Sequence, residues 1–140
     1  MLPKKQISFA TGTLIEMAGG STKAIEQIEL GDITRGGEVF GTMRIKVTPG
    51  AMYYYKGIWT TGSNPVNDDG VWRYVFESPH AKKALDTENN VTYTLACETH
   101  RIFVDGVEFV DYPETYDNDP LLVSYVEELL VHQNSAVKNI

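Results

Sequence analysis

Cysteine is almost absent from this sequence, because Cys97 is the only one among 140 residues. An internal disulfide needs two cysteines, and a zinc site built on cysteines needs several, so both are excluded. Val91, Tyr93 and Leu95 share the alternation phase of Cys97. This pattern favours a buried thiol inside a strand, with a reactive thiol as the alternative.

Long hydrophobic runs and an excess of positive charge are also missing. No apolar run approaches the roughly 20 residues of a membrane span, and residues 1–5 lack the apolar stretch of a signal peptide. With 12 Lys and Arg against 19 Asp and Glu, the formal net charge is −7, which disfavours binding to a phosphate backbone. We expect a soluble, intracellular protein, in the cytoplasm or in the host cytoplasm if viral, that binds neither nucleic acid nor a membrane.

Short apolar segments dominate what is present. Apolar positions alternate or come in bursts, and Gly or Pro interrupts them about every ten residues, which is typical of an all-β domain. The dipeptides Pro49-Gly50 and Asp105-Gly106 predict turns between strands. The expected strands cover 7–10, 13–17, 39–40, 44–48, 52–60, 71–77, 91–98, 101–104 and 107–110.

Two segments depart from the β pattern. Segment 21–32 suits one helical turn that ends at Gly31. Asp119 and Pro120 suit the start of a helix over 119–132, whose apolar residues share one face. We expect this helix to dock on the β-domain, with binding to a protein partner as the alternative. The domain organisation is then an N-terminal extension over 1–6, a β-domain over 7–112, a linker over 113–118, the helix, and a tail over 133–140.

Three motifs carry a resemblance to a known family. Residues 7–20 read ISFATGTLIEMAGG, followed by two spaced isoleucines and Gly31-Asp32. Residues 61–66 read TGSNPV, with a Gly and a Trp downstream, and residues 93–107 read YTLACETHRIFVDGV. In this order, these motifs resemble the Hedgehog/intein, or Hint, superfamily. There a nucleophile precedes Phe, a Thr-x-x-His-Pro-Val segment follows, and a His-containing turn and hairpin close the fold.

The resemblance implies a fold and a reaction. The fold is a compact all-β horseshoe with pseudo-twofold symmetry, and the reaction is attack of the Ser8 hydroxyl on the Ile7 carbonyl, which turns an amide into an ester. By resemblance, Thr61 and Asn64 act on the amide, and His100 is the acid or base. The substrate is the chain's own N-terminal segment, and neither a cofactor nor a metal is implied.

Three positions depart from the family pattern. Position 8 holds Ser where Cys is commonest, and position 64 holds Asn, which cannot shuttle a proton, where His is usual. Near Val110-Asp111-Tyr112 the splicing members of the family end in His-Asn and a further nucleophile, which are missing here. We predict no splicing and slow or absent cleavage before Ser8, and we count Asp111 among the candidate catalytic residues.

Four of the candidate residues also have a purely structural interpretation. Ser8 is a nucleophile or only a small polar residue, and Thr61 polarises the amide or bonds a strand end. Asn64 orients an amide or makes a turn before proline, and His100 is an acid or base or bonds a backbone group across the hairpin. His80 reads as a surface loop residue. The alternative function is a non-catalytic structural or protein-interaction module that retains the Hint fold, with a virus as one source.

Overall fold

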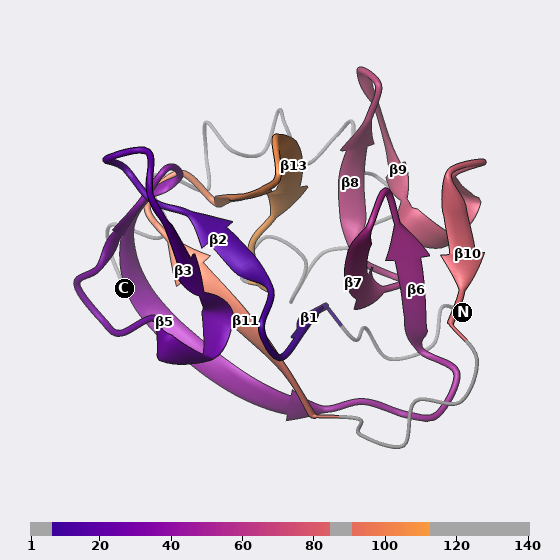
Figure 1. Ribbon diagram of the computed structural model, residues 1–140, viewed down its shortest axis with the longest axis horizontal. Helices are drawn as coiled ribbons and strands as arrows, with labels where there is room; N and C mark the ends of the chain where they lie inside the picture. The colour runs from indigo at the N-terminus through magenta and orange to yellow at the C-terminus, as the bar shows by residue number, and fades with distance from the viewer. Residues whose placement is uncertain (1–6, 85–90, 113–140) are drawn as a thin grey trace.

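A computed structural model of the chain describes residues 7–84 and 91–112 (Figure 1). Within these ranges nearly every regular element is a β-strand, so the expected all-β class is confirmed. The extension over 1–6, the linker over 113–118, the helix over 119–132 and the tail over 133–140 lie outside the described residues. No helix among the described residues is long and apolar enough to cross a membrane.

The described strands form three antiparallel sheets. The first has the order β10-β6-β7-β1-β11-β5-β4, the second the order β12-β13-β8-β9, and the third pairs β2 with β3. Their bounds are β1 Phe9–Ala10, β2 Leu14–Glu16, β3 Thr22–Ala24, β4 Ile33–Thr34, β5 Gly37–Lys46, β6 Met52–Tyr55, β7 Ile58–Thr61, β8 Pro65–Asp68, β9 Val71–Tyr74, β10 Ala81–Lys83, β11 Val91–Cys97, β12 Arg101–Val104 and β13 Val107–Val110.

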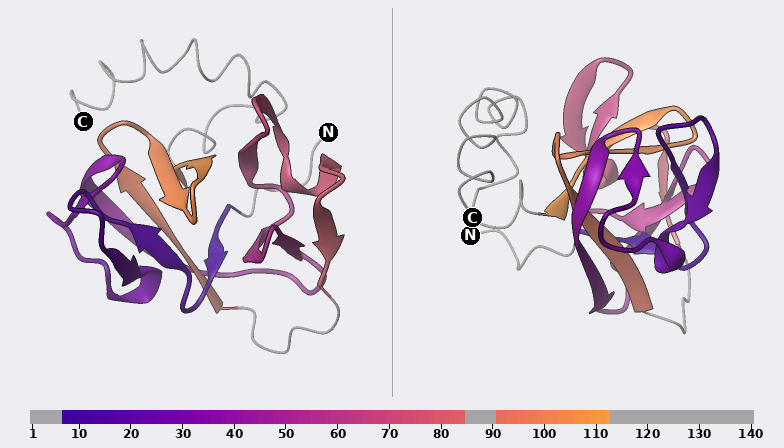
Figure 2. Two further views of the ribbon diagram at one scale, coloured as in Figure 1. Left: turned by 45° about the horizontal axis from the view of Figure 1, so that its top comes forward. Right: turned by 90° about the vertical axis from the view of Figure 1, so that its left-hand side faces the viewer.

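Strand β1 is the central element of the largest sheet. Phe9 lies opposite Tyr93 of β11 on one side and opposite Thr60 of β7 on the other. Figure 1 shows β1 between two groups of strands, with β2, β3, β5 and β11 on its left and β6 to β10 on its right. In both views of Figure 2, β5 and β11 run side by side as the long antiparallel pair of the first group. The residues just before β1 are therefore held in the middle of the molecule.

The core packs around aromatic rings from three different segments. Phe9 meets Phe109 edge to face, with 5.0 Å between ring centroids, and Tyr55 meets Phe109 at 6.4 Å. All three side chains are fully buried. Because burial of one such side chain stabilises a fold by about 1.5–3 kcal/mol, these contacts fix β1 against β13 and β6.

The structure corrects several expected element boundaries. The strand expected over 52–60 is a hairpin of β6 and β7, because Lys56 and Gly57 both adopt positive φ, 49° and 82°. The strands expected over 39–40 and 44–48 are replaced by the single ten-residue strand β5, Gly37–Lys46. The helical turn expected within 21–32 is only the 3₁₀ turn Ile25–Gln27. The turn predicted at Asp105-Gly106 is confirmed, with φ of 48° and 78°.

Candidate functional site

Ser8 lies immediately before β1 and is fully buried, as is the side chain of Ile7. The Ser8 backbone N–H donates to Thr61 Oγ1 at 3.2 Å, and the Thr61 backbone N–H donates to the Ser8 carbonyl at 3.0 Å. The hydroxyl of Thr61 therefore touches the nitrogen of the Ile7-Ser8 peptide bond. The structure thus brings together Ser8 and Thr61, the two residues that the first and second motifs place at the reaction centre.

The segment that follows Thr61 is held in place by close backbone packing. A Cβ at Gly62 would lie 2.5 Å from the ring of Tyr53, so only glycine allows this approach. The Gly62 N–H donates to the Ala51 carbonyl at 2.8 Å. Since these contacts leave the segment little freedom, the Thr61 hydroxyl is preorganised against Ser8.

Asn64 is buried in the same hydrogen-bonded group but reaches it through Thr60. Asn64 Nδ2 donates to Thr60 Oγ1 at 3.0 Å, and Thr60 Oγ1 lies 3.3 Å from the Ser8 carbonyl oxygen. Among residues 7–84 and 91–112, Asn64 Oδ1 has no hydrogen-bond partner although it is buried. The backbone N–H of Asn64 donates to the Thr61 carbonyl at 3.2 Å. Asn64 therefore shapes the turn and also contributes a side-chain amide to the site.

Thr92 on β11 is a member of the site that the sequence did not reveal. Its Oγ1 lies 2.6 Å from Ser8 Oγ, across 84 positions of the chain. The contact depends on the register between β1 and β11, in which Ala10 lies opposite Thr92. No local motif marks this residue, because a strand threonine with an apolar neighbour is common.

His100 and Asp111 form a buried pair. In the β12–β13 hairpin Arg101 lies opposite Val110, so the residues that flank the hairpin face each other. His100 Nδ1 lies 3.0 and 3.2 Å from the two carboxylate oxygens of Asp111, and both side chains are fully buried. Asp111 also accepts the Cys97 N–H at 2.9 Å. Because an ionised carboxylate only accepts, Nδ1 carries a proton and donates it to Asp111.

Cys97 is confirmed as a buried strand residue. Its thiol donates to the Arg101 carbonyl at 3.0 Å. Burial, and after it the charge of Asp111, raise the pKa of this thiol to about 12. The thiol therefore stays protonated at neutral pH and is a poor nucleophile.

The raised pKa of Cys97 predicts both low reactivity and an alkaline loss of stability. The native thiol should resist a disulfide-exchange reagent at pH 8 and react after unfolding in urea. Above pH 9 the unfolded thiol ionises while the native one keeps its proton, so the unfolded state binds fewer protons. The free energy of unfolding should fall by about 1.4 kcal/mol per pH unit up to about pH 12.

Urea unfolding at pH 8 to 11 of the wild type and of Cys97→Ala measures this effect. In the variant the free energy of unfolding should fall less steeply with pH, because only its tyrosines and lysines still titrate. Burial also raises the pKa of Tyr55, which adds to the alkaline loss in both proteins. Two results would contradict a raised pKa of Cys97: the same dependence of the unfolding free energy on pH in both proteins, or fast labelling of native Cys97 at pH 8.

His80 is exposed, as expected for a loop, but it has a partner. Its Nε2 lies 3.1 Å from Asp69 Oδ2, and the atoms of Asp68, Asp69 and His80 that could bind a metal lie within 4.8 Å of one another. Lys56 bonds Asp69 at 2.8 Å and, with His80, lowers the pKa of that carboxyl. Arg73 lies 3.4 Å from Asp68. Because cations of the chain already neutralise both carboxylates, we interpret this group as a structural ion-pair cluster.

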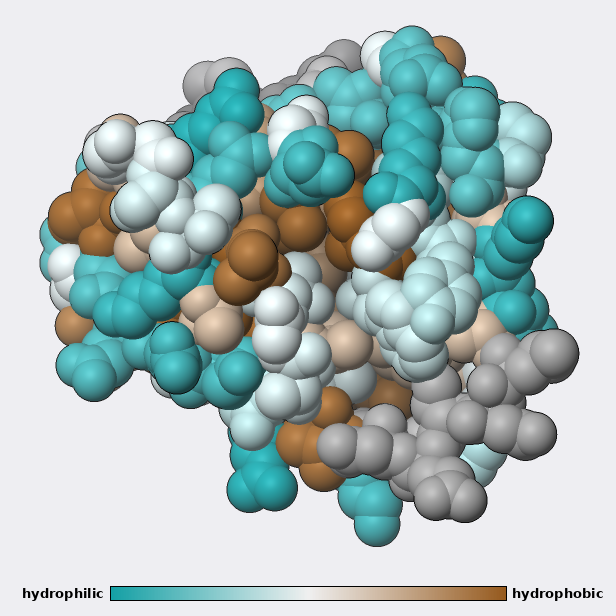
Figure 3. All heavy atoms as spheres, in the orientation of Figure 1, coloured by the Kyte–Doolittle hydropathy of each residue, from teal (hydrophilic) through white to brown (hydrophobic). Residues whose placement is uncertain are grey.

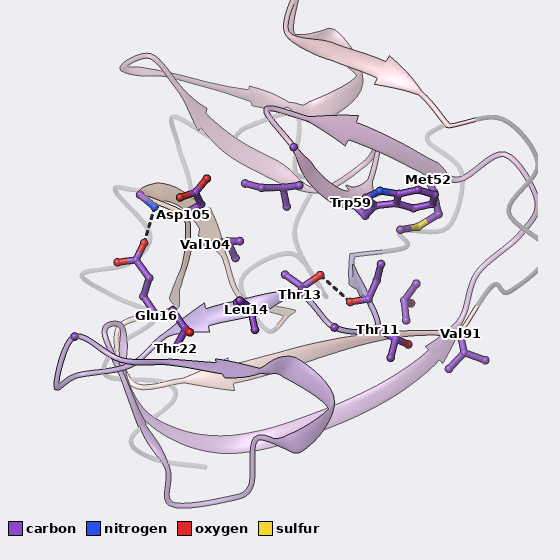
Figure 4. A pocket seen from close by; sticks show the side chains of 17 residues that line it. Thr11, Thr13, Leu14, Glu16, Thr22, Met52, Trp59, Val91, Val104 and Asp105 are labelled. Atoms are coloured by element: carbon purple, nitrogen blue, oxygen red, sulfur yellow. Dashed lines mark hydrogen bonds between the residues drawn. The ribbon is translucent and has the colours of Figure 1, made fainter.

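A cleft of about 970 Å³ opens beside the site. Figure 3 shows the molecular face hollowed there, with hydrophobic side chains around the hollow. Leu14, Trp59 and Val104 contribute apolar surface from three elements on its sides (Figure 4). Thr92 lines the cleft and also bonds Ser8, so the Ser8 hydroxyl lies one side chain away from it.

The chain path is similar to that of a solved structure. The solution structure of a bacterial intein-like domain from Clostridium thermocellum matches with a TM-score of 0.62 and 18% sequence identity, covering 77% of this chain and 100% of that chain. No protein-family model matches the chain, and a search of curated proteins gave no significant match. The similarity supports an all-β, intein-like fold, as the resemblance of the three motifs led us to expect.

Proposed function

Because this chain has an intein-like fold of the Hint type, we propose that it is a self-processing domain that acts on its own Ile7-Ser8 bond. The observation that supports this most directly is the hydrogen bond from the Ser8 N–H to the Thr61 hydroxyl, 3.2 Å long. This bond joins the Ser8 nitrogen, which is the leaving group when the Ile7-Ser8 bond breaks, to Thr61, which the second motif places beside that bond. Processing is slow, and it ends in cleavage without splicing.

The reaction is an N-to-O acyl shift. Ser8 Oγ attacks the carbonyl carbon of Ile7, the carbon–nitrogen bond breaks, and the hydroxyl proton ends on the Ser8 nitrogen as part of an amine. Thr61 Oγ1 accepts the N–H throughout, and this bond strengthens as the nitrogen gains positive charge. Water or another nucleophile then attacks the ester and releases residues 1–7.

We assign the acid or base of this shift to His100 from its place in the third motif. Asp111 holds the Nδ1–H of the ring, as the carboxylate does in other histidine-based sites, so Nε2 is the nitrogen that takes up and returns a proton. The pair is fully buried, which keeps bulk water from competing for that proton. Asp111 acts here as the residue that orients His100.

Asn64 accounts for the slow acyl shift that we propose. It is bonded to Thr60 and has no ionisable group, so it holds the local backbone but moves no proton. Loss of general acid or base help typically lowers a rate by about 10² to 10⁴. A serine hydroxyl is also a weak nucleophile unless a base activates it.

Incubation of the whole chain with hydroxylamine tests the proposal. Hydroxylamine attacks esters much faster than amides, so intact mass should show loss of residues 1–7 over hours to days. Ser8→Ala is the matched control and should stay at full mass, because it cannot form the ester. A wild-type mass that does not change relative to Ser8→Ala would reject self-processing at this bond.

The alternative, a non-catalytic module that retains the fold, is favoured by one observation. The Ser8 hydroxyl is buried and bonded to Thr92, as a structural serine would be. In that case Ser8→Ala should leave both the mass and every binding property unchanged. The hydroxylamine experiment separates the two functions without knowledge of a partner.

A further inference from the structure

The contact between Ser8 and Thr92 has a defined proton arrangement. Ser8 Oγ lies 2.6 Å from Thr92 Oγ1, and Thr92 Oγ1 donates to the Ile45 carbonyl at 2.9 Å. A hydroxyl has one proton, and a carbonyl oxygen can only accept. Because the proton of Thr92 is used on Ile45, the Ser8 hydroxyl must be the donor in the shorter bond.

This chain of hydrogen bonds ends without a base. Neither a threonine hydroxyl nor a backbone carbonyl takes up a proton at neutral pH, so the Ser8 proton cannot leave along it. Ser8 and Thr92 are both buried, at 0% and 1% exposure, so water does not replace the bond. The bond therefore stabilises the neutral, unreacted hydroxyl.

The same bond is lost during the acyl shift. When Ser8 Oγ bonds to the Ile7 carbon it gives up its proton, and the ester oxygen that results has nothing to donate to Thr92. An interaction made in the ground state and lost in the transition state slows a reaction. Thr92 thus opposes the step that Thr61 assists.

We propose that Thr92 is a positioning residue that holds the Ser8 hydroxyl in a resting orientation and restrains self-processing. The proposal builds on the self-processing function above. Thr92 also lines the cleft, so the restraint lies between the Ser8 hydroxyl and the cleft.

A comparison of Thr92→Val and Thr92→Ser tests the restraint. Valine has nearly the shape of threonine but no acceptor, and we expect it to raise the rate of ester formation by about 3- to 30-fold in the hydroxylamine assay. Serine keeps the hydroxyl and should return the slow rate. A Thr92→Val rate equal to or below that of the wild type would overturn the proposal.

A double-mutant cycle with Ser8→Cys separates restraint from general loosening of the fold. A thiol is a weak donor, so in the Ser8→Cys background Thr92→Val should change the rate by less than about 2-fold. Equal acceleration in both backgrounds would mean that valine acts by disturbing the sheet, and would also overturn the proposal.

NMR gives a readout that does not require processing. In the wild type the Ser8 side chain should occupy one χ1 rotamer, with a hydroxyl proton protected from exchange. In Thr92→Val it should average over rotamers. If no variant, Ser8→Cys included, ever forms an ester, self-processing is rejected, and the NMR result then decides whether Thr92 holds the Ser8 hydroxyl in one orientation. A Ser8 side chain that averages equally in both proteins would overturn it.

Discussion

Replacement of Asp111 by alanine should lower the free energy of unfolding by about 3–5 kcal/mol, measured by urea denaturation at pH 7. Asp111 accepts both the His100 ring N–H and the Cys97 backbone N–H, and all of these groups are buried. Without the carboxylate, two donors remain where water does not reach them. This loss exceeds that of a typical single substitution.

Asp111→Asn is the matched control, because asparagine has nearly the same volume and retains one acceptor oxygen. It should lose clearly less stability than Asp111→Ala. The double variant His100→Ala/Asp111→Ala should be more stable than the sum of the two single losses predicts, since each single change leaves a buried partner without its bond. If the two single losses of stability were additive, or if Asp111→Ala lowered the free energy of unfolding by less than about 1 kcal/mol, the His100–Asp111 pair would contribute little to stability.

The largest effect on activity should come from restoration of the two residue types that the motifs lack. Ser8→Cys with Asn64→His should raise the rate of cleavage before residue 8 by at least about 10², because a thiolate attacks better and an imidazole can carry the proton. Cleavage is measured by intact mass after addition of a small thiol. The buried Cys97 does not interfere, because its pKa is raised to about 12.

Two controls accompany the double replacement. Ser8→Ala/Asn64→His has the histidine but no nucleophile and should remain uncleaved. Because Asn64 is fully buried, the larger imidazole introduces strain of about 1–3 kcal/mol, so urea unfolding must show that the variant is folded. A folded, uncleaved Ser8→Cys/Asn64→His protein would mean that the scaffold no longer supports the reaction.

The sequence predicted those parts of the fold that depend on local patterns. Alternation around Cys97 predicted its burial, and Asp105-Gly106 predicted a two-residue turn; both are observed. The Lys56-Gly57 turn escaped prediction because lysine is rarely found at positive φ, so the apolar segment around it resembled one long strand. Gly57 is a local signal of this hairpin, but an isolated glycine in a strand pattern is also compatible with a bulge.

The site was predictable where a motif carries it and hidden where strand register creates it. The second motif singles out Thr61, and the Thr61 hydroxyl accepts the Ser8 N–H. The Ser8 contact with Thr92 and the Asp111 contact with His100 arise from pairings between strands, β1 with β11 and β12 with β13. A shift of register by one residue would abolish either contact without altering any motif.

The position of β1 has a consequence for the product of cleavage. Since every strand pairing of β1 lies after the Ile7-Ser8 bond, a processed chain would begin in the centre of its largest sheet. The new terminal amine would form at a buried site, beside the Thr61 hydroxyl. Burial without a counter-charge disfavours the ammonium form. The amine would therefore keep its lone pair and attack the ester again, so the shift would reverse until an outside nucleophile captures the acyl group.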